Sequence, residues 1–94
     1  MSATRITRQM LEEEWARFAD AYQIQRRQVV GGTGWDLDGW NPGEGGWLWS
    51  VCEYTDDEPG SVYRPRYSMG ERRLSTREMF ECLRFGRMMR GAIT

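Results

Sequence analysis

Apolar side chains near the start of the chain recur at intervals of four, three and four residues. They are Leu11, Trp15, Phe18 and Tyr22. This spacing places them on one face of an amphipathic helix. Thr7 stands before the run and is a suitable N-cap. We therefore expect a helix from about Arg8 to Arg26, followed by a short strand at residues 28–30.

A second helical pattern occupies the end of the chain. Ser75 and Glu78 have the spacing of a capping box, in which each side chain accepts from the backbone of the other. The apolar face that follows consists of Met79, Cys82, Leu83, Gly86 and Met89. Gly91 suits a C-terminal cap, so we expect the helix to end there. Gly86, inside the helix, is expected to allow close packing against the sheet or the first helix.

The pattern between the helices changes to that of strands. Residues Trp47–Tyr54 are apolar on both faces, which is typical of a central strand. Residues Val62–Met69 alternate, and Pro65 removes one backbone donor, which favours an edge position. The two segments are separated by a turn-rich connection. The simplest arrangement is an antiparallel hairpin of these two strands.

A glycine-rich acidic segment precedes the hairpin. Residues 31–46 hold seven glycines, two tryptophans, three acids and no arginine. Glycine is costly to order, so we expect a loop. Trp47 and Trp49 share one face of the following strand and are expected in the core. Trp35 and Trp40 lie within the loop, where they either fold back as a lid or stand exposed; the sequence leaves both alternatives open.

Together these elements predict a single α+β domain over residues 1–94. Its order is a helix, the Gly/Trp-rich acidic loop, an antiparallel β-hairpin with room for a third short strand, and a closing helix. Both helices are expected to pack on one face of the small sheet. The length suits one domain near the lower limit of independent folding. With so small a sheet, a homodimer that buries further apolar surface is compatible with the sequence.

The amino-acid composition argues against several kinds of catalytic and metal-binding site. The chain has no histidine and no lysine, so all 13 cationic side chains are arginine. The usual general base near neutral pH and the commonest metal ligand are therefore missing. We expect no enzymatic activity, no cofactor and no metal site. Cys52 and Cys82 are expected to be buried thiols, and the sequence leaves a disulfide between them open. No apolar run is long enough to span a membrane and no secretory leader is visible, so a cytoplasmic location is expected.

Charge is segregated along the chain. Residues 1–27 carry +1, residues 28–63 carry −7 and residues 64–94 carry +5. Exposed tryptophans with flanking acids are typical anchors for a protein partner that is rich in arginine or lysine. The residues expected to form such a partner-binding surface are Trp35, Asp36, Asp38, Trp40, Glu44, Asp56, Asp57 and Glu58.

In its size and its lack of catalytic motifs, the chain resembles the small single-domain proteins of phages and mobile elements, including anti-CRISPR inhibitors. This class-level resemblance implies a non-catalytic inhibitor that occludes a basic surface of a larger nucleic-acid-handling complex. The alternative is a small DNA- or RNA-binding regulator that uses the arginines of the second helix and its entry. Those arginines are Arg72, Arg73, Arg77, Arg84, Arg87 and Arg90.

Overall fold

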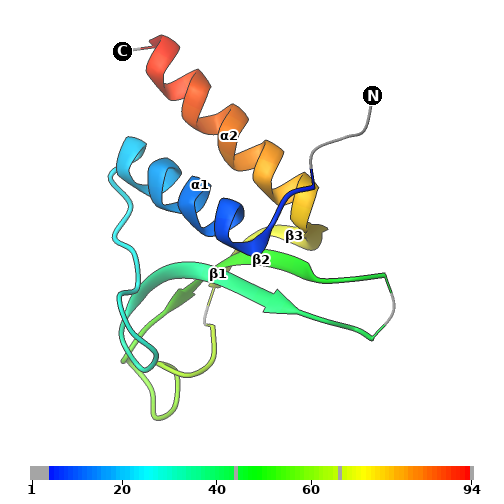
Figure 1. Cartoon of the computed structure of the whole chain (residues 1–94). Helices are drawn as coiled ribbons and strands as arrows, with labels where there is room; N and C mark the ends of the chain where they lie inside the picture. Colours follow the sequence, from blue (N-terminus) through cyan, green and yellow to red (C-terminus); the bar gives the residue numbers. More distant parts are fainter. Residues whose placement is uncertain (1–4, 44, 66, 94) are drawn as a thin grey trace.

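The computed structural model describes residues 5–43, 45–65 and 67–93. Its elements are α1 (Arg8–Ala21), β1 (Gly34–Trp40), β2 (Leu48–Tyr54), β3 (Tyr67–Ser75) and α2 (Thr76–Ile93). Figure 1 shows that both helices lie on one face of the sheet and that β3 runs directly into α2. The predicted α+β class is confirmed. Among the described residues, neither helix is long and apolar enough to cross a membrane.

The sheet has the order β1-β2-β3, and both pairings are antiparallel. β2 is the central strand, as its two apolar faces predicted. It pairs with β1 in a regular hairpin from Gly34 opposite Tyr54 to Trp40 opposite Leu48. The third strand is β1, and not the short strand that was expected at residues 28–30.

β1 lies inside the segment that was expected to be a loop, so that expectation is wrong for residues 34–40. Side chains alternate along the strand, with Trp35 and Leu37 packed against the core. Gly39 is needed because the ring of Trp49 lies against it: a Cβ at Gly39 would come 2.7 Å from Trp49 Cζ3. At this position glycine lets a large ring approach the backbone instead of loosening the chain.

β3 begins at Tyr67, five residues later than the predicted strand, and it runs on to Ser75. Residues 59–63 form consecutive turns, in which Tyr63 N–H donates to the Gly60 carbonyl at 3.0 Å. The pairing with β2 is irregular: Trp49 lies opposite Leu74, and Val51 lies opposite Met69. Four residues of β3, 70–73, therefore face a single residue of β2 as an enlarged β-bulge.

α1 begins at the predicted residue and ends five residues earlier than predicted. Thr7 caps it, since its Oγ1 accepts from Met10 N–H at 3.2 Å. At the other end Gln23 has a positive φ of 55°, and Ile24 N–H donates to the Ala19 carbonyl at 2.8 Å. This is a Schellman-type end built without glycine, which explains why the sequence concealed it. Residues 28–30 form no strand.

α2 carries the predicted capping box. Ser75 N–H donates to Glu78 Oε1 at 3.0 Å, and Glu78 N–H donates to Ser75 Oγ at 3.2 Å. The helix continues through Gly91 to Ile93, so the predicted end at Gly91 is wrong. The expected close approach at Gly86 is confirmed on the α1 side, because a Cβ there would come 2.7 Å from Phe18 Cε2.

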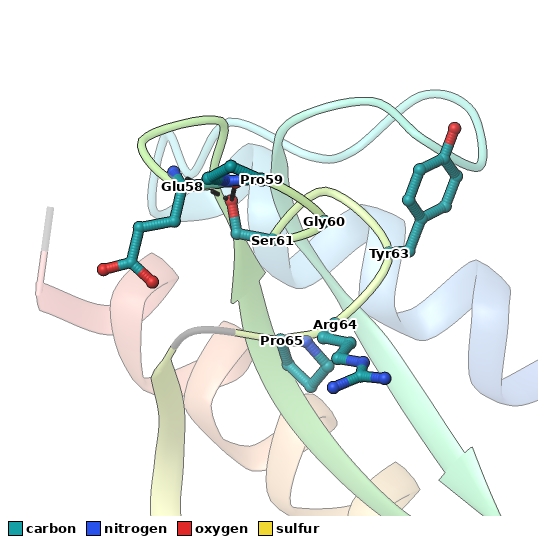
Figure 2. A pocket seen from close by; sticks show the side chains of 7 residues that line it. All are labelled: Glu58, Pro59, Gly60, Ser61, Tyr63, Arg64 and Pro65. Atoms are coloured by element: carbon teal, nitrogen blue, oxygen red, sulfur yellow. Dashed lines mark hydrogen bonds between the residues drawn. The ribbon is translucent and has the colours of Figure 1, made fainter.

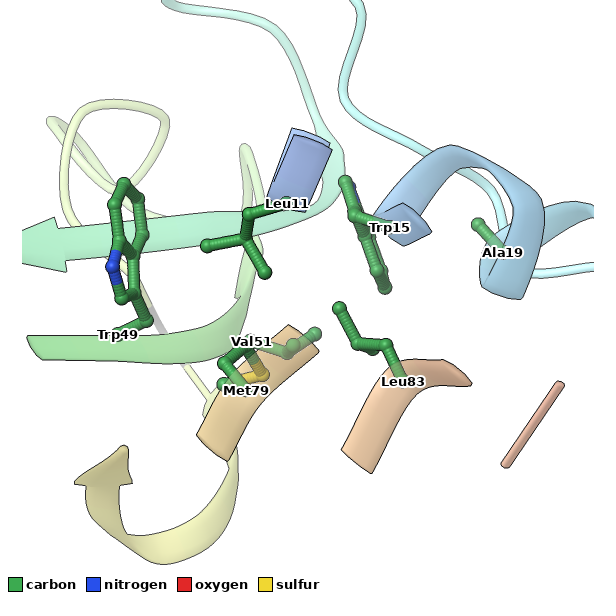
Figure 3. Packing of buried hydrophobic residues seen from close by; sticks show 7 residues of the cluster. All are labelled: Leu11, Trp15, Ala19, Trp49, Val51, Met79 and Leu83. Atoms are coloured by element: carbon green, nitrogen blue, oxygen red, sulfur yellow. The ribbon is translucent and has the colours of Figure 1, made fainter. Parts of the chain in front are cut away.

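The core lies between the helices and the sheet. Figure 3 shows the buried cluster, which consists of Leu11, Trp15, Ala19, Trp49, Val51, Met79 and Leu83. Trp49 is thus in the core as expected, whereas Trp47 is 44% exposed and the expectation for it is wrong. Cys52 is buried, but Cys82 is exposed, because it lies to one side of the Met79–Leu83 face. A partly buried ion pair joins the helices: Arg87 Nε donates to the buried Glu14 Oε2 at 2.6 Å.

Candidate functional site

β1 places three of the predicted partner-binding residues on one face of the sheet. Asp36, Asp38 and Trp40 alternate with the residues that face the core, so they lie on the face away from the helices. Trp40 is 53% exposed, whereas Trp35 is half-buried and packs against the core. The two tryptophans therefore divide between the two alternatives that the sequence left open.

Asp38 is held by partners from two other segments of the chain. Arg73 Nη2 lies 2.6 Å from Asp38 Oδ2, and the Tyr54 hydroxyl donates to Asp38 Oδ1 at 3.3 Å. The guanidinium of Arg27 stacks 3.8 Å from the centre of the Tyr54 ring. Burial, followed by the negative charge of Asp38, raises the pKa of Tyr54 to about 12. The network holds Asp38 in place, and Arg73 offsets most of its charge.

Asp36 has a different environment. Its Oδ1 accepts a hydrogen bond from Leu37 N–H at 2.8 Å, and it makes no ion pair within the part of the chain that the structure describes. Burial raises the pKa of the Asp36 carboxyl, and the Leu37 hydrogen bond and the charge of Arg27 oppose that rise. Asp36 is the less compensated of the two carboxylates on β1.

The remaining acids lie elsewhere. Asp56, Asp57 and Glu58 are all exposed in the turn that follows β2. That turn adjoins the Gly34 end of the hairpin, six residues along the strand from Trp40, which corresponds to about 20 Å. The predicted surface is therefore divided between the two ends of the sheet. Glu44 lies outside the described residues.

A hollow of about 590 Å³ is formed by the turn after β2 and the residues that follow it. Figure 2 shows its lining, which is Glu58, Pro59, Gly60, Ser61, Tyr63, Arg64 and Pro65. The hydroxyl of Ser61 is engaged within the turn, where Oγ lies 2.6 Å from the Thr55 carbonyl and 2.7 Å from that of Glu58. The side chains of Glu58 and Tyr63 point away from one another.

The other side chains that could serve as metal ligands or nucleophiles are dispersed over the described structure. Within residues 5–43, 45–65 and 67–93, no three Cys, Asp or Glu side chains are grouped so as to hold a metal ion. The buried Cys52 Sγ lies 3.0 Å from Ser50 Oγ, and burial raises the pKa of its thiol. A thiol in this environment stays protonated and is a weak nucleophile.

The arginines of the alternative nucleic-acid surface mostly contact groups of the same chain. Arg72 and Arg73 lie on β3, and the other four lie on α2. The ion pairs that they form are Arg72–Glu78 at 3.6 Å, Arg73–Asp38 at 2.6 Å, Arg77–Glu81 at 3.5 Å and Arg87–Glu14 at 2.6 Å. The guanidinium of Arg90 lies 5.8 Å from the centre of the Tyr22 ring.

The structure also exposes aromatic and apolar residues that sequence reasoning did not select. Trp47 stacks on Trp49 with 5.8 Å between ring centres, and Arg8 lies over both rings. The sequence carried one signal for the exposure of Trp47, because this residue follows two glycines and lies just before β2. On α2, a second exposed apolar group consists of Phe85, Met88 and Met89.

Comparison with known proteins adds no assignment to these sites: no protein-family model, no curated protein and no solved structure matches the chain.

Proposed function

We propose that this protein is a non-catalytic protein-binding module whose contact is anchored by Trp40. The observation that carries the proposal is the position of this indole. It is 53% exposed at the end of β1, on the sheet face that no helix covers. Exposed tryptophans are costly in water and dominate the energetics of protein interfaces. Trp40 stands beside the carboxylates of β1, which is the combination expected of an anchor with an acidic surround.

The proposed partner has a basic surface. Residues 28–63 carry seven acids and no arginine, and Asp56, Asp57 and Glu58 are exposed. Such a field attracts a positively charged partner and speeds its encounter. In its specific form, the protein occludes a nucleic-acid-binding surface of a larger complex, in the manner of the phage-encoded inhibitors that it resembles in kind. The exposed apolar group on α2 offers a separate surface for a homodimer.

The alternative of direct DNA or RNA binding is less favoured by the contacts of the arginines. Binding of a phosphate would have to break or share the ion pairs of Arg72, Arg73, Arg77 and Arg87. The acidic segment would also oppose the approach of a polyanion. The contacts therefore support the protein-binding proposal over this alternative.

A capture experiment tests the proposal. Tagged protein is mixed with lysate of the source cells, and the wild type, Trp40→Ala and Phe85→Ala are compared after circular dichroism has confirmed their folding. Phe85 is the matched control because it is also aromatic and exposed, at 67%, but lies on α2. We expect Trp40→Ala to lose a nucleic-acid-handling protein that the other two retain.

Recovery of the same proteins by all three forms would contradict the proposal. So would a protein that remains bound to the beads only while nucleic acid is intact, because it would indicate bridging by DNA or RNA. A gel-shift assay at low salt addresses the alternative directly, since nucleic-acid binding is strongest there.

A further inference from the structure

A pocket of about 320 Å³ lies where the segment that enters α1, the start of β2 and the start of α2 meet. Figure 1 shows the first of these segments passing beside the start of α2. The pocket is lined by two arginines, Arg5 and Arg8, by two tryptophans, Trp47 and Trp49, and by Ile6 and two threonines. None of these lining residues is acidic, so the pocket combines a cationic part with an aromatic and aliphatic part.

The cationic part offers N–H donors that the chain itself does not use. Within the described residues, the Arg5 guanidinium makes no ion pair or hydrogen bond, and the Trp47 indole N–H makes no hydrogen bond. Arg8 donates through Nε alone, to Glu12 Oε1 at 3.1 Å. Both side chains of that pair are more than half exposed, so the pair contributes little and leaves the Nη atoms of Arg8 available.

The aromatic part is held in place from below. Trp49 is buried in the core, and its Nε1–H donates to Thr76 Oγ1 at 2.9 Å. The exposed Trp47 stacks on this fixed ring, with 5.8 Å between ring centres and 28° between the planes. The Arg8 guanidinium carbon lies 5.9 Å from the centre of Trp47 and 5.5 Å from that of Trp49. A cation and an aromatic surface are therefore within reach of one small ligand.

We propose that this pocket binds a nucleotide, with the base against Trp47 and the phosphate between Arg5 and Arg8. Indole rings stack on bases of any sequence, and guanidinium groups bind phosphate oxygens in pairs. The two arginines offer more donors than the two oxygens of a carboxylate accept, whereas a phosphate has three acceptor oxygens and up to two negative charges. The pocket is larger than a phosphate needs, and apolar side chains line the remainder, so the anion has to carry a ring.

This site is separate from the surface on which the proposed function rests. Trp40 lies opposite Leu48 and shares its face of the sheet, away from the helices. Trp47 stacks on Trp49, which faces the helices and the core. The volume of the pocket suits one small ligand, and the seven acids of residues 28–63 oppose a chain of phosphates. A free nucleotide is therefore favoured over a nucleic-acid strand.

Calorimetric titration tests the inference with AMP, adenosine and inorganic phosphate as the probes. We expect AMP to bind about tenfold or more tightly than either fragment, because only AMP engages both parts of the pocket. Arg5→Gln should weaken AMP binding several-fold. This variant leaves the fold intact, because Arg5 makes no contact of its own with the described chain. The matched control is Arg17→Gln, an exposed arginine of α1 that does not line the pocket and should leave AMP binding unchanged.

The indole N–H signals of ¹⁵N-labelled protein locate the bound nucleotide. The signal of Trp47 is identified by its absence in Trp47→Phe, and that of Trp40 by its absence in Trp40→Phe. We expect AMP to shift the Trp47 signal and to leave the Trp40 signal in place.

Four results would overturn the inference: no binding of AMP at millimolar concentration, binding of adenosine or phosphate as tight as that of AMP, unchanged AMP binding in Arg5→Gln, or a shift of Trp40 without one of Trp47. A decameric oligoadenylate distinguishes the source of the nucleotide. If it binds far more tightly than AMP and depends on Arg5, the ligand is a nucleic-acid strand and the assignment to a free nucleotide fails. Capture of a protein partner through Trp40 is measured independently, so the two proposals stand or fail separately.

Discussion

Arg73 on β3 holds Asp38 on β1 across the central strand. Its Nη2 lies 2.6 Å from Asp38 Oδ2, and its Nη1 lies 2.7 Å from the Asp38 carbonyl oxygen. Ser50, which pairs with Asp38 from β2, is small enough for the longer arginine side chain to pass over it. The two outer strands share no ladder of hydrogen bonds, so this contact links them directly.

Replacement of this arginine should destabilise the fold. The side chains of Arg73 and Asp38 are only 32% and 25% exposed. Loss of two charge-assisted hydrogen bonds in Arg73→Met should lower the free energy of unfolding by about 1–3 kcal/mol. The control is Arg72→Met, whose side chain is 72% exposed and 3.6 Å from Glu78. The Arg72→Met substitution should lower the free energy of unfolding by less than about 0.5 kcal/mol, because exposed ion pairs contribute little to stability. Urea unfolding measures both, and equal effects would contradict the assignment.

The two glycines of α2 should respond to alanine in opposite directions. In an open helical position, Gly→Ala stabilises by about 0.5–1 kcal/mol. Gly91 is such a position, since among the described residues no atom outside its own stretch of helix lies within 4 Å of a Cβ built there. At Gly86 the new Cβ would come 2.7 Å from Phe18 Cε2, so Gly86→Ala should destabilise by about 1–3 kcal/mol. Thermal unfolding of both variants checks this, and stabilisation by Gly86→Ala would show that α1 and α2 pack less closely.

Tyr54 should make the protein sensitive to alkali. Burial raises its pKa from 10.0 to about 12, which means that the folded protein holds the phenol proton more tightly than the unfolded chain does. The stability gained from this difference is present below pH 10 and is lost as the pH rises from about 10 to about 12. The difference in ultraviolet absorbance between the wild type and Tyr54→Phe isolates the titration of this group. A midpoint near 10 would contradict the burial of its hydroxyl network.

The two thiols should differ in reactivity. Cys82 is exposed on α2, whereas Cys52 is 3% exposed in the central strand and burial raises the pKa of its thiol. A disulfide reagent at neutral pH should label one thiol per chain rapidly and the second only on unfolding. Cys82→Ser should abolish the rapid phase. Rapid labelling that persists in this variant would place Cys52 at the surface.

The features that could be predicted from the sequence are those that depend on neighbouring residues. The cap of α1 at Thr7 and the capping box of Ser75 and Glu78 are local hydrogen bonds, and both are confirmed. The central position of β2 follows from its two apolar faces, which are also a local pattern. These signals fix where the helices begin and which strand lies in the middle.

The features that were missed depend on contacts distant in sequence. In the sequence, Gly39 is typical of a loop. Its role in a strand depends on the ring of Trp49, which lies against it in the structure. The turns before β3 are accompanied by a hydrogen bond from Ser61 back to Thr55, which the sequence pattern does not show. The end of α1 at Ala21 is followed by Gln23 in the positive-φ position where a glycine is usual.

The candidate site was only partly accessible to sequence reasoning. The alternation of Trp35 and Leu37 with Asp36 and Asp38 was present and would have separated the positions that face the core from those on the other face of the sheet, had the segment been treated as a strand. The pairing of Asp38 with Arg73, 35 residues away, could not be foreseen, because it requires the irregular course of β3. The pocket beside Trp47 becomes visible only once residues 5–8 and the start of α2 are placed next to each other.

The bulge at residues 70–73 has a consequence for how copies of this protein, or fragments of others, can assemble on it. The bulged outer border of β3 does not offer an evenly spaced row of backbone donors and acceptors, so a further strand cannot pair along its length. Fibrous polymers require two receptive borders on every unit. With one irregular border, copies of this protein cannot stack edge to edge into an open-ended sheet.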